Sequence, residues 1–322
     1  MLRKLISFFT PARSQSRRAK KLIVIETNRI ESLFLNREGG LLVDWDMAHT
    51  WVRKEYPAES DHVHALRAIA AAWLDRLQRD SKTDLHRWRH AEVEGLAPLD
   101  GGVSRRVAIA GDCGALLVGE AMSKITGRKS IDPLCLIGVA THEDYYTFIA
   151  PFYPDEGEFA TSGGVYLNEG GAGLPLIVLP IEGNRQSLEA TIAHELTHHA
   201  LHHLDLPLWI EEGLTQMMEE RVTGMSNFVL SPTLVERHQA HWDAESLTAF
   251  WSGESFSSAD GESQELSYSL AQAIVRAQLA DRSAEFIRFI RAAASDSTGE
   301  LAARSELGQS LESLAGRLID ID

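Results

Sequence analysis

The sequence predicts an α+β protein in which a mixed β-sheet region is followed by a mostly helical region. Three short apolar runs, bounded by turn-forming residues, have the length of strands: 134–139, 164–168 and 174–179. From residue 184 onward, apolar residues instead recur at the i, i+3 and i+4 spacing of helices. A chain of 322 residues is long enough to bury a large core and to form two lobes.

Further elements are expected on both sides of these strands. Apolar spacing predicts helices over 66–77, 114–127 and 143–149, and later over 234–241, 266–279 and 284–293. Residues 106–110 are expected to form a strand. The run His86–His90 has two histidines at i, i+4 without an acid between them, and is interpreted as a solvated helix face rather than a second metal site.

The composition is that of an ordinary globular protein, with 44% hydrophobic and 24% charged residues. The formal net charge of −15 provides no basic footprint, so nucleic acid is not an expected partner. Two cysteines make no disulfide framework, and a reducing, cytoplasmic compartment is the simpler expectation. Cys113 and Cys135 are both expected to be buried as small hydrophobic residues.

Residues 1–21 carry seven basic residues and no acid, and are expected to form a flexible basic tail. The alternatives are a membrane-surface contact or an organelle transit peptide. The apolar run 5–9 is too short to cross a membrane, so stable membrane insertion is not expected. The remaining chain is expected to divide into an N-terminal α/β region (22–104), a sheet-containing upper lobe (105–183) and a helical lobe (184–322).

The strongest functional signal is the run from His194 to His198, which reads His-Glu-Leu-Thr-His inside a predicted helix over 184–204. Positions four apart on an α-helix differ in direction by only about 40°, so the two imidazoles project side by side. Two imidazoles placed in this way can bind one Zn²⁺. An apolar stripe of Leu188, Ile192 and Leu196 lies on the opposite side of the helix and is expected to be buried.

A carboxylate that can complete this site follows in the run Trp209–Gly213. A second helix is expected to begin near Pro207, with Asp205 as its cap, and to continue to about Val222. The short connection 204–206 brings it back beside the first helix. Three protein ligands leave a fourth position for water, which is typical of a catalytic zinc site.

Glu195 is not a metal ligand in this interpretation. It lies beside His198 on the helix, where it can accept a proton from a water molecule activated by zinc. The alternative is that the histidine pair is an ordinary surface feature. His199, His202 and His203 are expected to face solvent or to orient the ligands from behind.

Together these motifs resemble the gluzincin metallopeptidases of the peptidase MA-like group. The resemblance rests on His194–His199 and Leu208–Leu214, and extends to Ser267–Ala271 and Glu306–Glu312. It implies a zincin-like fold, with a mixed β-sheet upper lobe, a mostly helical lower lobe and the zinc site between them. It also implies that Glu212, rather than Glu211, is the third ligand.

The resemblance further implies hydrolysis of a polypeptide substrate at one Zn²⁺ held by His194, His198 and Glu212, with Glu195 as the general base. Tyr268 is a second catalytic candidate, as a hydrogen-bond donor to the oxyanion, with a structural role as the alternative. The chain lacks a Gly-x-Met-Glu-Asn run, so an endopeptidase is favoured over an aminopeptidase. The alternative function is a catalytically silent zincin-fold binding or regulatory protein. No sequence feature specifies an oligomeric state.

Overall fold

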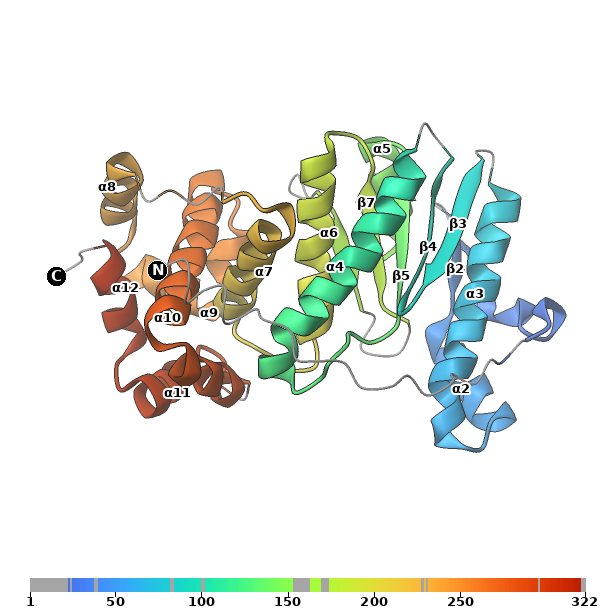
Figure 1. Ribbon diagram of the computed structural model, residues 1–322, viewed down its shortest axis with the longest axis horizontal. Coiled ribbons are helices and arrows are strands. Elements are labelled where there is room, and N and C mark those ends of the chain that lie inside the picture. Colours follow the sequence, from blue (N-terminus) through green and yellow to red (C-terminus); the bar gives the residue numbers. More distant parts are fainter. Residues whose placement is uncertain are drawn as a thin grey trace. The chain divides into compact units, whose positions relative to one another are not determined.

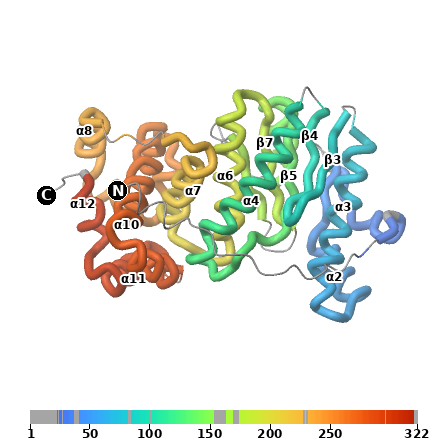
Figure 2. Tube along the Cα trace, in the orientation of Figure 1, coloured from blue at the N-terminus to red at the C-terminus, as the bar shows by residue number. Residues whose placement is uncertain are grey.

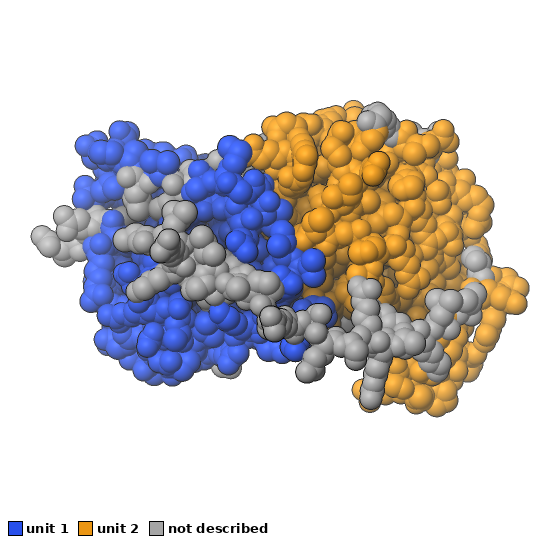
Figure 3. Space-filling view, in the orientation of Figure 1, with its two compact units in different colours: residues 1–12, 116–130, 197–322 blue, residues 13–115, 131–196 orange. Residues whose placement is uncertain are grey.

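The protein is described by a computed structural model, and the expected basic tail, 1–21, lies outside the described residues. The described residues are 23, 25–37, 40–81, 84–99, 102–152, 163–168, 174–226, 229, 231–294 and 296–319. They divide into two compact units, coloured separately in Figure 3. The sheet unit takes its described residues from 13–115 and 131–196, and the helical unit takes them from 116–130 and 197–322.

The sheet unit is built on a five-stranded mixed sheet with the order β3-β4-β5-β7-β6. The three central strands, β4, β5 and β7, are parallel, and the edge strands β3 and β6 are antiparallel to their neighbours. A separate hairpin pairs β1 with β2. The strands are β1 Phe34–Arg37, β2 Gly40–Val43, β3 Leu85–His90, β4 Val93–Pro98, β5 Leu134–Val139, β6 Val165–Leu167 and β7 Leu176–Pro180.

Helices cover both faces of this sheet, as expected when the central strands are parallel and almost wholly apolar (Figure 1). Helices α2 (Trp45–Glu55), α3 (His62–Asp80) and α5 (His142–Ile149) share one hydrophobic core with Cys135 and Ile137 of β5. Helix α4 (Val103–Thr126) packs on the other face, where Gly111 lies against Leu136. Helix α6 (Arg185–Leu201) lies beside α4 on that face (Figure 2).

Several expectations from the sequence are confirmed here. The strands over 134–139, 164–168 and 174–179 are β5, β6 and β7, and the helices over 66–77 and 143–149 lie within α3 and α5. The sheet takes strands from both the expected N-terminal region and the expected upper lobe. Within the described residues, no helix combines the length and the apolar content needed to cross a membrane.

Three expectations are wrong. Residues 106–110 belong to α4, where Val107 and Ala110 are buried at helical spacing and Ile109 is exposed; a short apolar run fits a helix as well as a strand. The run His86–His90 is strand β3, which pairs with β4 across a two-residue turn where Ala91 has a φ of 44°. Cys113 is exposed on α4, whereas Cys135 is buried and burial raises the pKa of its thiol.

The helical unit contains two helices that pack closely along each other, α7 and α10, surrounded by shorter ones. The two helices expected over 266–279 and 284–293 form one helix, α10, which bends where Arg282 leaves helical geometry (φ −138°, ψ 48°). The helices are α7 Leu208–Thr223, α8 Pro232–His241, α9 Ala244–Ser252, α10 Gly261–Ala293, α11 Glu300–Ala302 and α12 Leu311–Ile319.

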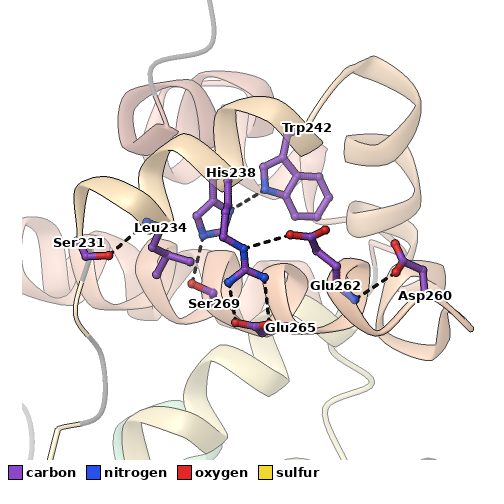
Figure 4. A network of polar contacts seen from close by, with 9 residues as sticks. Ser231, Leu234, His238, Trp242, Asp260, Glu262, Glu265 and Ser269 are labelled. Atoms are coloured by element: carbon purple, nitrogen blue, oxygen red, sulfur yellow. Dashed lines mark hydrogen bonds and ion pairs between the residues drawn. The ribbon is translucent and has the colours of Figure 1, made fainter.

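Polar contacts attach α8 to α10 (Figure 4). His238 is buried, its Nδ1 atom lies 2.8 Å from the indole nitrogen of Trp242, and its Nε2 atom lies 3.1 Å from Ser269 Oγ. An indole N–H can only donate, so Nδ1 accepts, and the imidazole proton is on Nε2, where it is donated to Ser269. Arg237 pairs with Glu262 and Glu265 of α10 beside this contact. Burial, followed by the charge of Arg237, lowers the pKa of His238 to about 4.

This low pKa predicts that acid weakens the fold. In the unfolded chain His238 has a pKa near 6.5, so between about pH 6.5 and pH 4 the unfolded state binds the extra proton. Stability therefore falls as the pH is lowered through this window. Melting temperatures measured from pH 7 to pH 4.5 are expected to fall less steeply in His238→Gln than in the wild type. His86→Gln, at an exposed position, is the matched control. An unchanged slope in His238→Gln contradicts the prediction.

Candidate metal centre

Helix α6 places His194 and His198 one turn apart, as the sequence predicted. The apolar stripe is also confirmed, since Leu188, Ile192 and Leu196 are all buried. Part of this burial is against α4, because a Cβ atom added to Gly114 would lie 2.8 Å from Leu196. Packing of the apolar side therefore fixes the rotation of α6 about its axis, and with it the direction of the two imidazoles.

Helix α7 begins at Leu208, close to the expected start, but its predicted cap is wrong. Pro207 occupies the N-cap position, and no side chain caps the helix there. Asp205 instead has a positive φ of 48° in the connection between the helices. Asp tolerates the left-handed region better than most residues, so its role is to turn the chain rather than to cap α7.

The first turn of α7 is anchored by Trp209, which is completely buried. Its indole nitrogen donates a hydrogen bond to the carbonyl of Thr298 at 2.9 Å. Its ring lies 5.2 Å from the ring of Trp251 and 6.0 Å from that of Phe289, between centroids. A buried indole held by packing and by a hydrogen bond leaves the following residues, Glu211 and Glu212, little freedom of position.

Gly213 allows α7 to approach α10 closely. A Cβ atom at this position would lie 2.6 Å from the carbonyl oxygen of Ala271 and 2.5 Å from Val275 Cγ2. Both distances are far below van der Waals contact, and the carbonyl oxygen of Ala271 cannot move unless the backbone of α10 moves. The glycine after Glu212 is therefore explained by packing between the two helices.

The three expected ligands come together. One ligand atom from each of His194, His198 and Glu212 lies within 4.8 Å of the others, and no other such group of three is found within the described ranges. His198 Nε2 is 3.6 Å from Glu212 Oε1, which is too long for a hydrogen bond. Two ligands of a tetrahedral zinc, with bonds of about 2.0–2.1 Å, are separated by about 3.3–3.4 Å. The observed separation is close to that value.

Neighbouring polar groups orient two of the ligands. His198 Nδ1 lies 2.8 Å from Glu211 Oε1, and in a neutral imidazole it donates its hydrogen to this carboxylate, so that Nε2 is the nitrogen that could bind a metal. The Thr215 hydroxyl donates to the backbone carbonyl of the buried Glu212 at 2.7 Å and lies 3.3 Å from Oε2 of the same residue, while Oε1 faces His198. Sequence reasoning treated Glu211 only as a rejected ligand and did not consider Thr215. The available signals in the sequence were an acid one position before Glu212 and a hydroxyl three positions after it.

The remaining candidates are placed less directly by the structure. Glu195 is buried, at 7% exposure, between the two histidines on α6. Tyr268 is half-buried on α10, one turn before Ala271, and its ring packs edge-on against Phe256 at 5.2 Å. Both the catalytic and the structural role of Tyr268 stay predictions. His199 is buried and stacks on His202, so the solvent-facing alternative is wrong for His199.

The chain matches no protein-family model, and no curated protein matches it significantly. The assignment of the metal therefore depends on the residues themselves. Two imidazole nitrogens and one carboxylate oxygen form a donor set that suits zinc and leaves one coordination position for another ligand. The orientation of His198 by Glu211 is the arrangement that zinc-binding histidines require.

The packing at Gly213 predicts an unusual response to alanine. Inside a helix, Gly→Ala normally stabilises by about 0.5–1 kcal/mol, but here the added methyl group forces α7 and α10 apart. Gly213→Ala is expected to lower the free energy of unfolding by about 1–3 kcal/mol and to weaken zinc binding, because Glu212 moves. Gly261→Ala, where nothing lies within 4 Å of the added atom, is the control. A stabilised Gly213→Ala variant with unchanged zinc affinity contradicts the packing argument.

The two adjacent acids are expected to respond differently to removal of their charge. Glu212→Gln removes an anionic ligand and is expected to abolish stable zinc binding. Glu211→Gln only weakens the support of His198 and is expected to lower zinc affinity by up to about 10–100-fold. Zinc affinity is measured by competition with a chromogenic chelator. A larger loss in Glu211→Gln than in Glu212→Gln would show that the ligand assignment is wrong.

Proposed function

We propose that this chain is a zinc metallopeptidase of the gluzincin type, with a zincin-like fold. The main support is the convergence of His194, His198 and Glu212 within 4.8 Å, next to a buried Glu195. A purely structural zinc site has no use for a carboxylate between its histidine ligands. The presence of Glu195 therefore favours catalysis over the silent binding protein.

The proposed chemistry is divided between the metal and the chain. When bound, zinc supplies a Lewis acid that polarises a carbonyl oxygen and lowers the pKa of water toward about 7. Glu195 accepts the proton of the attacking water and returns it to the nitrogen of the leaving amine. Glu211 keeps the His198 ring in the tautomer that ligation requires, and the Thr215 hydroxyl lies beside one carboxylate oxygen of Glu212.

The proposed substrate is an extended polypeptide, and strand β6 offers a place for it. Among the described strands, β6 is at the edge of the sheet and pairs with β7 alone. The chain just before it packs on α6, where a Cβ atom on Gly164 would lie 2.6 Å from Thr191 Cγ2. Thr191 is one turn before His194. A peptide added to this edge by backbone hydrogen bonds is positioned along the helix that carries the histidines.

An endopeptidase is proposed rather than an aminopeptidase, because the chain lacks the Gly-x-Met-Glu-Asn run. Such a run anchors a substrate amino terminus in the related aminopeptidases. Without this anchor, an internal peptide bond is the simpler target. The test is whether new amino termini appear within polypeptides whose own amino termini are blocked.

The general base is tested with Glu195→Gln, which keeps the size of the side chain and removes its basicity. We expect this variant to bind zinc and melt like the wild type, while hydrolysis of unstructured polypeptides falls by about 10²–10⁴-fold. New amino groups are measured with both proteins loaded with zinc. Equal turnover in the two proteins excludes Glu195 as the base. A zinc-loaded wild type that cleaves nothing in a broad substrate panel supports the silent zincin-fold protein instead.

The role of Tyr268 is tested by removing its hydroxyl. If the hydroxyl donates to the oxyanion, Tyr268→Phe is expected to lower kcat by about 10²–10³-fold with little change in KM or melting temperature. Unchanged kcat in Tyr268→Phe assigns the residue to packing against Phe256. In that case Tyr268→Ala is expected to lower the free energy of unfolding by about 3–5 kcal/mol.

A further inference from the structure

The sheet unit contains a cavity of about 480 Å³ that the proposed reaction does not use. Its lining includes Pro98 at the end of β4, Ile137 near the end of β5 and Phe148 of α5. Pockets that bind small molecules in proteins have volumes of about 300–1,000 Å³ and mostly apolar walls. In open α/β sheets, ligands bind at the carboxyl ends of parallel strands, where this cavity lies.

The cavity is on the opposite face of the sheet from α6. Ile137 belongs to the core shared with α3 and α5. Its neighbour Leu136 points to the other face, toward Gly111 of α4, and α4 in turn contacts α6. Successive side chains of a strand alternate between faces, so the sheet separates the cavity from the helix that carries His194. The two features can therefore be tested independently.

The ionisable groups of the described lining are acidic, and Arg76, which is outside the lining, forms an ion pair with one of them, Asp80. Two carboxylates line it, from Asp80 at the last residue of α3 and Asp144 in the first turn of α5, and none of its described lining residues is Lys, Arg or His. Asp80 lies at the negative end of the α3 dipole and Asp144 at the positive end of the α5 dipole, so the two helix dipoles act on this charge in opposite directions.

Both carboxylates are held in position through their Oδ2 atoms. Arg76 Nε contacts Asp80 at 2.9 Å, and the Thr141 hydroxyl contacts Asp144 at 2.8 Å. These contacts restrict the positions of both carboxylates, while the ion pair with Arg76 offsets part of the charge of Asp80.

We propose that this cavity binds a small amphiphilic cation, with an apolar body on the aliphatic and aromatic floor and one ammonium or guanidinium group at Asp80 and Asp144. The apolar floor would bind the apolar body of the ligand, since burial of apolar surface is the main source of affinity in such pockets. The paired carboxylates select the head group, because an anion would be repelled and a neutral head would gain no charge-assisted hydrogen bond.

The test compares three ligands that share one apolar chain and differ only in the charge of the head group. Octylammonium, octanol and octanoate are titrated into the full-length protein at about physiological ionic strength, and binding is measured by calorimetry. We expect octylammonium to bind more tightly than octanol, and octanoate to bind weakest. Octanoate binding as tightly as octylammonium, or no saturable binding of octylammonium, overturns the proposal.

Variants then locate the binding site. Asp80→Asn/Asp144→Asn is expected to lower octylammonium affinity by roughly fivefold or more, as expected for loss of two partly exposed ion pairs, and to leave octanol unchanged. Asp46→Asn/Glu59→Gln removes the same charge from exposed positions outside the cavity and is the matched control. Ala140→Trp, at the cavity lining, is expected to block both ligands. An equal loss in the control pair, or unchanged binding in all three variants, places the cation elsewhere and overturns the proposal. Melting curves confirm that each variant is folded.

Discussion

The close contact of α7 with α10 at Gly213 is the constraint on which the candidate metal centre depends. Because Gly213 faces α10 at close range and adjacent helix residues differ in direction by about 100°, this contact fixes the direction in which Glu212 projects from α7. Trp209, completely buried one turn earlier, prevents α7 from rotating or sliding along this contact. The aromatic core and the helix packing thus hold one carboxylate at the position where His198 Nε2 lies 3.6 Å away.

Two adjacent glutamates perform different tasks because they occupy different positions on the helix. Glu212 is buried and faces the imidazole nitrogen that can bind a metal, whereas Glu211 contacts the other nitrogen of the same ring. A buried carboxylate is costly unless a positive charge or hydrogen bonds compensate it. A zinc ion would compensate Glu212 and, at the same time, use the His198 lone pair that Glu211 leaves available. The polar groups of the centre are therefore mutually consistent with one divalent cation.

Sequence reasoning succeeded where the signal was local. The histidine pair, its apolar stripe and the helix carrying Glu212 follow from spacing within one or two helical turns, and the structure places them as predicted. The errors arose where the deciding contact is distant in sequence. Residues 106–110 are helical because they continue into a long helix packed on the sheet, and His86–His90 is a strand because β4 pairs with it. The contact of Glu211 with His198 also joins two helices, so the sequence shows the acid next to Glu212 but not its partner.

The most direct test of the central claim is X-ray absorption at the zinc edge of the metal-loaded protein, combined with anomalous diffraction to locate the ion. The account predicts one zinc with two imidazole nitrogens at about 2.0–2.1 Å, one carboxylate oxygen from Glu212 and one oxygen that does not come from the protein. Zinc bound by four protein ligands, zinc bound through Glu211, or no zinc at His194 and His198 would contradict it.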